Sequence, residues 1–276
     1  MMGSARWACA LLLLLLAAHA HADVSIKSVD RKINLKTQIA RVTDVIEFTS
    51  SSGAASSVLL CYPSRLAERI ARLRVTAGDA KAEAVPAAAP AGAPDGVSCF
   101  SVAVALADGG SVSVEAAASI TSVMTPNPAK VAQDEPMLVE YRDTLYAVSP
   151  YKIDKQSTTV TLPTANVVKF SPKSKGSQDG GKIAFKKLAA AEPWTLTPLK
   201  LHFQHDKQFK KVLTLVREIE VSHWGNIYVE ESYILQNAGA EHKGQFSRLR
   251  HTHNVVYRAT SFQVRPSNQL CSWSPM

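Results

Sequence analysis

The chain of 276 residues is long enough for one large domain or two domains of ordinary size. Apolar residues make up 46% of it, which supports a hydrophobic core and excludes wholesale disorder. The formal net charge is +8, but the basic residues are scattered and form no nucleic-acid-binding motif, so we expect a solvated basic surface and no nucleic acid partner.

Residues 1–22 have the features of a cleavable signal peptide. Arg6 supplies the positive charge, an apolar run follows from Trp7, and Ala20-His21-Ala22 is a small-x-small cleavage site. The apolar run is about a dozen residues long, short of the roughly 20 that cross a bilayer, and no later run of the sequence reaches that length. We therefore expect a mature chain that begins at Asp23 and carries no membrane anchor of its own.

The cysteines are consistent with an oxidising compartment. Cys9 leaves with the signal peptide, and Cys61, Cys99 and Cys271 remain. Cys61 and Cys99 are the natural disulfide pair in such a compartment, although sequence alone leaves open that both are buried thiols.

The first half of the mature chain has mostly strand patterning. Residues 24–39 and 42–48 alternate between apolar and polar side chains, and residues 57–62 form a short apolar run that ends at Pro63. Residues 67–75 fit a strand or a short helix, and the spacing of Ile70 and Leu73 mildly favours the helix.

Turn and loop signals divide the next part of the chain. Residues 84–96 are rich in Ala, Pro and Gly and predict a flexible surface loop. Residues 97–107 and 110–117 alternate well on either side of a turn at residues 108–110, which predicts a hairpin. Residues 137–148 are aromatic and β-prone, and we place a domain boundary after them.

The second half ends in the most informative pattern. Residues 158–162 and 166–170 predict strands, and residues 171–182 predict a loop. Residues 212–236 predict a hairpin with one mainly apolar and one mainly polar face. His223, Trp224, Gly225 and Asn226 form its turn, where Trp224 is either a core plug, which we favour, or an anchor for a partner.

These patterns predict a mainly β protein with two consecutive β-sandwich-like domains, over residues 23–148 and 149–248, the second of them incomplete. No nucleotide-binding, phosphate-binding, serine-hydrolase, zinc-protease or Cys-x-x-Cys motif is present in the sequence. Two further groups of residues could bind a metal or act as glycosidase-type acid–base pairs, but solvent exposure or ordinary packing explains each better. They are the histidines His202, His205, His251 and His253, and the acidic pairs Glu218/Glu220 and Glu230/Glu231. The sequence thus predicts no catalytic residue, no cofactor and no metal site.

Four segments resemble the ribophorin I family, subunit 1 of the oligosaccharyltransferase complex. They are residues 34–42 (NLKTQIARV), residues 146–159 with SPY and KQSTT, residues 217–231 (REIEVSHWGNIYVEE), and residues 243–248 (KGQFSR). They occur in the family's order, and the resemblance extends over about residues 23–248.

The resemblance implies a non-catalytic, β-rich luminal subunit in the endoplasmic reticulum. Such a subunit supports transfer of a preassembled glycan from dolichyl diphosphate to Asn in Asn-x-Ser/Thr of nascent chains. The implied partners are the other subunits of the complex, including the catalytic one, together with nascent polypeptides and, through the complex, the membrane. Family members are type I membrane proteins with a C-terminal anchor.

After Arg248 the resemblance ends, and residues 249–276 form a divergent tail. We expect a truncated product of alternative splicing or a shifted reading frame, which transcript sequencing across codon 248 would test. Two other functions remain open from sequence: a soluble secreted β-sandwich binding module, and a hydrolase that uses the acidic pairs.

Overall fold

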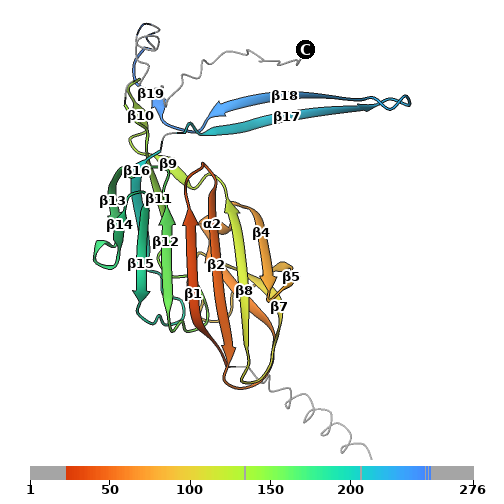
Figure 1. Ribbon diagram of the computed structural model, residues 1–276, viewed down its shortest axis with the longest axis vertical. Helices are drawn as coiled ribbons and strands as arrows, with labels where there is room; N and C mark the ends of the chain where they lie inside the picture. Colours follow the sequence, from red (N-terminus) through yellow and green to blue (C-terminus); the bar gives the residue numbers. More distant parts are fainter. Residues whose placement is uncertain (1–22, 134, 206, 246, 248, 250–276) are drawn as a thin grey trace, which may run out of the picture.

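The computed structural model describes residues 23–133, 135–205, 207–245, 247 and 249. The predicted signal peptide, residues 1–22, and nearly all of the predicted tail, residues 249–276, lie outside the described residues. The described chain consists mainly of strands in several sheets, so the prediction of a mainly β fold is confirmed (Figure 1). Among the described residues, no helix has the length and apolarity of a membrane span.

An eight-stranded sheet, in the order β14-β15-β12-β1-β2-β8-β4-β5, is the main body of the fold (Figure 1). Its strands are β1 (Val24–Asn34), β2 (Ala40–Ser50), β4 (Ile70–Ala77), β5 (Ala80–Ala82), β8 (Ser111–Ile120), β12 (Gln156–Thr161), β14 (Ser177–Asp179) and β15 (Lys182–Leu188). Neighbours pair antiparallel except β1 and β12, which are parallel. Burial alternates along β2, where Val42, Ile46 and Phe48 face the core.

Two smaller sheets share one continuous hydrophobic core with the large sheet. The three-stranded sheet, ordered β3-β7-β6, consists of β3 (Ala55–Pro63), β6 (Ala84–Ala87) and β7 (Val97–Leu106). The four-stranded sheet, ordered β13-β16-β11-β9, consists of β9 (Met124–Pro126), β11 (Leu138–Thr144), β13 (Val167–Ser171) and β16 (Pro198–Gln204). Short helices α2 (Ser64–Ala67) and η1 (Lys173–Lys175) lie in the connections.

The predicted hairpin around residues 108–110 is wrong, although both of its strands exist. Strand β7 pairs with β3 and β6, whereas β8 pairs with β2 and β4, so the turn connects two different sheets. Alternation shows only that each strand has one buried face. Two strands that face each other across a core alternate in the same way as two strands that pair in a hairpin.

Three other local predictions also need correction. The helix favoured over residues 67–75 is instead the end of α2 followed by strand β4, because pairing with β8 outweighs a weak helical spacing. The loop predicted at residues 84–96 begins with β6, where Pro86 is tolerated because β6 is an edge strand. The loop predicted at residues 171–182 contains η1 and β14.

The large sheet continues across the predicted domain boundary after residue 148. Strand β1 pairs with β12 from Val29↔Gln156 to Asn34↔Thr161, so strands from both sides of the boundary are hydrogen-bonded neighbours. The division into two folding units at this point stays a prediction.

A charged network lies in the core where the large and four-stranded sheets meet. Arg31 is 2% exposed, and its Nη2 donates to Asp143 Oδ2 at 2.9 Å. Asp143 also accepts hydrogen bonds from the Tyr141 hydroxyl at 2.8 Å and the Thr144 amide at 2.7 Å. Asp44, on the other side, lies 3.7 Å from Arg31 Nε without a hydrogen bond to it.

A long hairpin projects away from the sheets (Figure 1). It consists of β17 (Lys210–Val221) and β18 (Ile227–Asn237), which pair only with each other among the described residues. The prediction of this hairpin is confirmed. At its base, β10 (Lys130–Val131) pairs in parallel with β19 (Glu241–His242).

Candidate functional site

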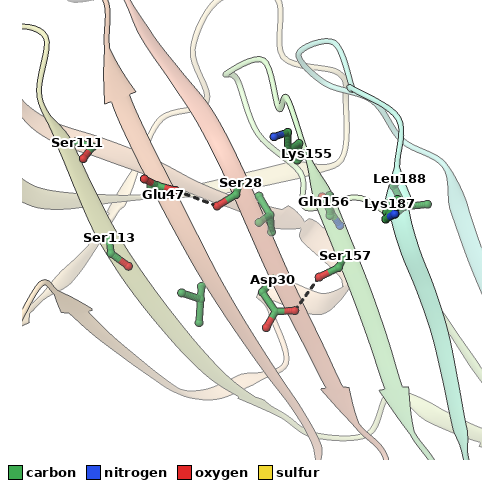
Figure 2. A pocket seen from close by; sticks show the side chains of 12 residues that line it. Ser28, Asp30, Glu47, Ser111, Ser113, Lys155, Gln156, Ser157, Lys187 and Leu188 are labelled. Carbon is green, nitrogen blue, oxygen red and sulfur yellow. Dashed lines mark hydrogen bonds between the residues drawn. The ribbon is translucent and has the colours of Figure 1, made fainter.

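A cavity lies on the outer face of the eight-stranded sheet (Figure 2). Its volume is about 770 Å³, and strands β1, β2, β8, β12 and β15 supply nearly all of its lining. The polar side chains that line it are Ser28, Asp30, Glu47, Ser111, Ser113, Lys155, Gln156, Ser157 and Lys187. We call this the outer-face cavity. Small hydroxyl side chains on neighbouring strands leave this space open because they project little above the sheet.

Asp30 lines the outer-face cavity, and the charge of its carboxylate is balanced by a lysine. It accepts a hydrogen bond from Ser157 Oγ at 2.8 Å (Figure 2) and pairs with Lys32 at 3.0 Å. Burial acts to raise the pKa of Asp30, but the hydrogen bonds from Lys32 and Ser157 outweigh burial and lower that pKa. Asp30 is therefore an ionised, fixed acceptor and not a proton donor at neutral pH.

The charge of the Glu47 carboxylate is balanced in the same way. Lys27 Nζ donates to it at 2.7 Å and Ser28 Oγ donates at 3.2 Å (Figure 2). The hydrogen bond from Lys27 is the main cause that lowers the pKa of Glu47. Acid catalysis needs a carboxyl whose pKa is raised, so the two carboxylates of this cavity do not form an acid–base pair.

Lys155 and Lys187 stand at the β12–β15 side of the outer-face cavity (Figure 2). Neither has an ion-pair partner among the described residues, and Lys187 has a left-handed backbone with φ 53°. The cavity therefore offers fixed hydroxyls, paired carboxylates and two free ammonium groups, which suit binding and not bond cleavage.

No pattern in the sequence indicates the outer-face cavity. The alternation in β1, β2 and β8 does indicate an outward polar face, but such a face is typical of any half-buried sheet. The hollow depends on the parallel pairing of β1 with β12, which brings Ser157 beside Asp30. No local signal in the sequence specifies that pairing.

The predicted site residues His223, Trp224, Gly225 and Asn226 lie at the tip of the hairpin. The Ser222 amide donates to the Asn226 carbonyl at 2.9 Å, and Gly225 has φ 88°, a conformation that favours glycine. Trp224 is 93% exposed, so the favoured prediction that it plugs a core is wrong. Its role as a partner anchor stays a prediction.

One face of this hairpin carries an exposed apolar row. Cross-strand pairs Leu215↔Tyr233, Ile219↔Val229 and Val221↔Ile227 share that face, and every member is between 39% and 68% exposed. We call these six residues the apolar hairpin row. The other face carries Glu218 directly opposite Glu230. The ion-paired Arg217↔Glu231 lies on the same face as the row, between Leu215↔Tyr233 and Ile219↔Val229, and interrupts it. Exposed apolar side chains gathered on one face are typical of an interaction site.

Cys61 and Cys99 are bonded to each other in the structure and are directly opposite on β3 and β7. Val148 is buried beside them, and the partly buried Trp194 packs against this small cluster. Neither cysteine lines the outer-face cavity or belongs to the apolar hairpin row, and both are buried, which indicates a structural role.

His202 and His205, weighed as metal ligands, are two separate structural residues. His202 Nε2 lies 2.8 Å from the Asn127 carbonyl oxygen, and His205 is buried against Phe209 with ring centroids 4.7 Å apart. Within the described ranges, no group of three or more His, Cys, Asp or Glu side chains is placed to hold a metal ion. His251 and His253 lie outside the described residues.

The fold and these surfaces are those of a β-rich protein with exposed apolar side chains on a projecting hairpin. The family model described as Ribophorin I matches residues 24–270, which extends past Arg248, where the sequence alone predicted the resemblance to end. The chain belongs to the ribophorin I family.

Its curated relatives include plant oligosaccharyltransferase subunits. "Dolichyl-diphosphooligosaccharide--protein glycosyltransferase subunit 1A" of Arabidopsis thaliana is 33% identical over 264 residues, which are 92% of this chain and 41% of that protein. Subunit 1B of Oryza sativa subsp. japonica is 31% identical over 256 residues, 89% of this chain and 52% of that protein. The chain thus spans about half the length of these relatives or less.

Solved structures resemble the chain only distantly. The M1 zinc metallopeptidase from Deinococcus radiodurans covers 90% of this chain with 11% identity and a TM-score of 0.39. Native yeast LTA4 hydrolase covers 68% with 9% identity and a TM-score of 0.42. Likenesses this slight carry no argument about function.

Proposed function

We propose that this chain acts as a luminal, non-catalytic part of an oligosaccharyltransferase subunit in the endoplasmic reticulum. The observation that carries the proposal is the family match over residues 24–270, together with relatives that are named as subunit 1 of this glycosyltransferase. In this role the chain supports transfer of a glycan from dolichyl diphosphate to Asn in Asn-x-Ser/Thr of nascent proteins, while another subunit performs the transfer.

The geometry supports binding more than catalysis. Both carboxylates of the outer-face cavity are held ionised by lysine and serine partners, so that cavity lacks a proton donor with a raised pKa. Glu218, Glu220 and Glu230 on the polar face of the hairpin are exposed, and Glu231, on the opposite face, is paired with Arg217. Hydrolysis by these acidic pairs is accordingly disfavoured.

We further propose that the apolar hairpin row, with Trp224 at the tip, contacts another subunit of the complex. A two-stranded hairpin by itself is marginally stable in water, and burying its apolar face against a partner stabilises it. Aromatic residues such as tryptophan are enriched among the residues that dominate binding energy in interfaces.

A paired substitution tests this contact. Ile219→Asp places a charge in the middle of the row, and Val168→Asp places one at a similarly exposed position on β13, 59% against 57% exposed. In microsomes, the amount of tagged Ile219→Asp chain that co-purifies with the catalytic subunit should fall at least about tenfold. The reason is that burying an unpaired charge costs more than about 1.4 kcal/mol. The Val168→Asp chain should co-purify as the parent does.

The parent chain itself tests the broader function. If the parent is found only in the medium and never with the complex, the chain is a secreted binding module instead of a subunit. If the two variants lose association equally, the chain still belongs to the complex but the hairpin is not its contact surface.

A further inference from the structure

A second hollow, at the junction of α2, β9 and β11, is lined by three arginines. Its volume is about 380 Å³, and its polar lining consists of Arg65, Arg69, Ser122, Thr125, Glu140 and Arg142. We call it the arginine hollow. It lies on the outer side of the four-stranded sheet and shares no lining residue with the outer-face cavity.

Two of the three guanidinium groups are held in place without being neutralised. Arg65 Nη1 donates to the Arg142 carbonyl at 2.8 Å, and Arg69 Nη1 donates to the Ser122 carbonyl. Neither arginine has a carboxylate partner among the described residues. A guanidinium has five N–H donors, so each keeps most of its donors for a ligand while the carbonyl contact fixes its orientation.

The single carboxylate in the hollow, that of Glu140, is already paired with an arginine. Glu140 Oε1 accepts a hydrogen bond from Arg142 Nε at 2.7 Å, which balances the charge of Arg142. Arg65 and Arg69 therefore contribute two uncompensated positive charges to one small space.

The neighbouring surface adds to this positive field. Arg142 on β11 lies directly opposite Lys200 on β16, a pairing of like charges that weakens a sheet. Lys200 and Lys169 line an adjoining hollow of about 370 Å³ that also shares Glu140. Clustered positive charges of this kind raise the local potential and attract anions.

We propose that the arginine hollow is a binding site for a phosphate group, carried as a monoester or a diphosphate. Such a group bears a charge of about −2 at neutral pH, which matches two free guanidiniums, whereas a single carboxylate bears half of that. The forked guanidinium geometry also fits phosphate oxygens in bidentate fashion. The Ser122 and Thr125 hydroxyls add neutral donors at the rim. This inference goes beyond the proposed subunit role and does not depend on it.

Calorimetric titration of the full chain with pyrophosphate tests the site. At about 150 mM salt, electrostatic attraction to the exposed surface is screened beyond roughly 8 Å, so weak non-specific binding is suppressed. Saturable binding is expected, and Arg65→Gln and Arg69→Gln should each weaken it about tenfold or more, since hydrogen bonds to charged groups contribute about 1.5–3 kcal/mol. The matched control is Arg74→Gln on β4, an exposed arginine outside the hollow, which should leave the affinity within about twofold.

A second measurement needs no variant. Pyrophosphate should protect Arg65 and Arg69 of the parent chain from phenylglyoxal, as mapped by mass spectrometry, and should leave Arg74 reactive. Absence of saturable binding, equal losses in all three variants, or protection of Arg74 as strong as that of Arg69 would overturn the proposal. Tighter binding of a poly-glutamate peptide than of pyrophosphate would also overturn it, in favour of an acidic protein partner.

Vesicles identify the source of the phosphate. Sedimentation with phosphatidylcholine vesicles that contain phosphatidic acid, lost in Arg69→Gln and absent with pure phosphatidylcholine, would support a lipid headgroup. Binding of pyrophosphate without vesicle sedimentation would support a soluble phosphate ligand at the same site.

Discussion

Among the described residues, Arg31 is the largest fully buried side chain. Two carboxylates face it, those of Asp143 and Asp44, and they differ in their hydrogen bonds. Asp143 is fully engaged with Arg31, Tyr141 and Thr144, whereas Asp44 Oδ1 has no hydrogen-bond partner in the described structure. Burial raises the pKa of Asp44, while the coulombic attraction of Asp143 and Asp44 raises the pKa of Arg31 despite its burial. Arg31 therefore stays charged, and Asp143 contributes more than Asp44 to holding that charge in the core.

Replacing the two carboxylates separately should give very different losses of stability. Asp143→Asn leaves Arg31 without its hydrogen-bonded counter-ion and should lower the free energy of unfolding by about 3–5 kcal/mol. Asp44→Asn removes a poorly satisfied charge and should change it by less than about 1.5 kcal/mol. Urea unfolding monitored by fluorescence measures both values, and equal losses would contradict the unequal roles.

The pH dependence provides an internal check on Asp44. Because its pKa is higher in the folded chain, folding takes up a proton between the unfolded value, about 3.9, and the folded value. Stability contributed by this group is therefore lost as pH rises through that window. Asn at position 44 does not titrate, so the Asp44→Asn chain should gain stability relative to the parent as pH rises from below 4 towards neutrality.

At the scale of elements, β3 and β7 are connected by both hydrogen bonds and a covalent bond. Their antiparallel register places Cys61 opposite Cys99, with Cα atoms 4.1 Å apart. Strand β7 also pairs with the edge strand β6, so the disulfide fixes the central strand of the three-stranded sheet to its long neighbour.

Removing this disulfide should destabilise the chain measurably. The two cysteines are 38 residues apart, and closing a loop of that length restricts the unfolded chain by about 4 kcal/mol in the entropy model. We expect the Cys61→Ala/Cys99→Ala chain to lose about 2–4 kcal/mol in denaturant titrations. A non-reducing peptide map of the parent is the control, and a map with both thiols free would remove the basis for the prediction.

Sequence patterning identified individual strands far better than their partners. Alternation placed β1, β2, β7 and β8 correctly, because each strand buries one face. The same alternation suggested that β7 and β8 form a hairpin, which they do not, since the two belong to different sheets. Only the hairpin of β17 and β18 was predicted with its true partner, because no other described strand competes for either one.

At the scale of the whole molecule, strands from the two halves of the chain form one sheet over one core. Strand β1 lies between β2, close in sequence, and β12, which is remote. Phe185 from β15 and Phe203 from β16 are fully buried in the same core cluster as Phe48. The outer-face cavity depends on this assembly, because its lining combines residues 28–113 with residues 155–188. The arginine hollow is lined by residues 65–142 alone, but these come from separate elements that only the folded chain brings together.

Truncation should therefore affect the two parts of the chain unequally. Residues 23–148 alone lose β12, β15 and β16, and we expect them to show no cooperative unfolding and rapid proteolysis. A chain in which an Asn-Gly turn replaces residues 212–235 should stay folded, because the residues it removes are nearly all exposed. Circular dichroism melts with limited proteolysis measure both, and a stable 23–148 fragment would support a domain boundary there.

The parallel pairing of β1 with β12 also fixes an order of events during synthesis. A ribosome delivers β1 and β2 early, but the far edge of β1 has no partner until residue 161 has emerged. At roughly 5–20 residues per second this interval is on the order of ten seconds, during which a strand with open backbone groups is exposed to other nascent chains. We expect a chaperone to occupy that edge in the interval, so that the rate of elongation influences the yield of the native sheet.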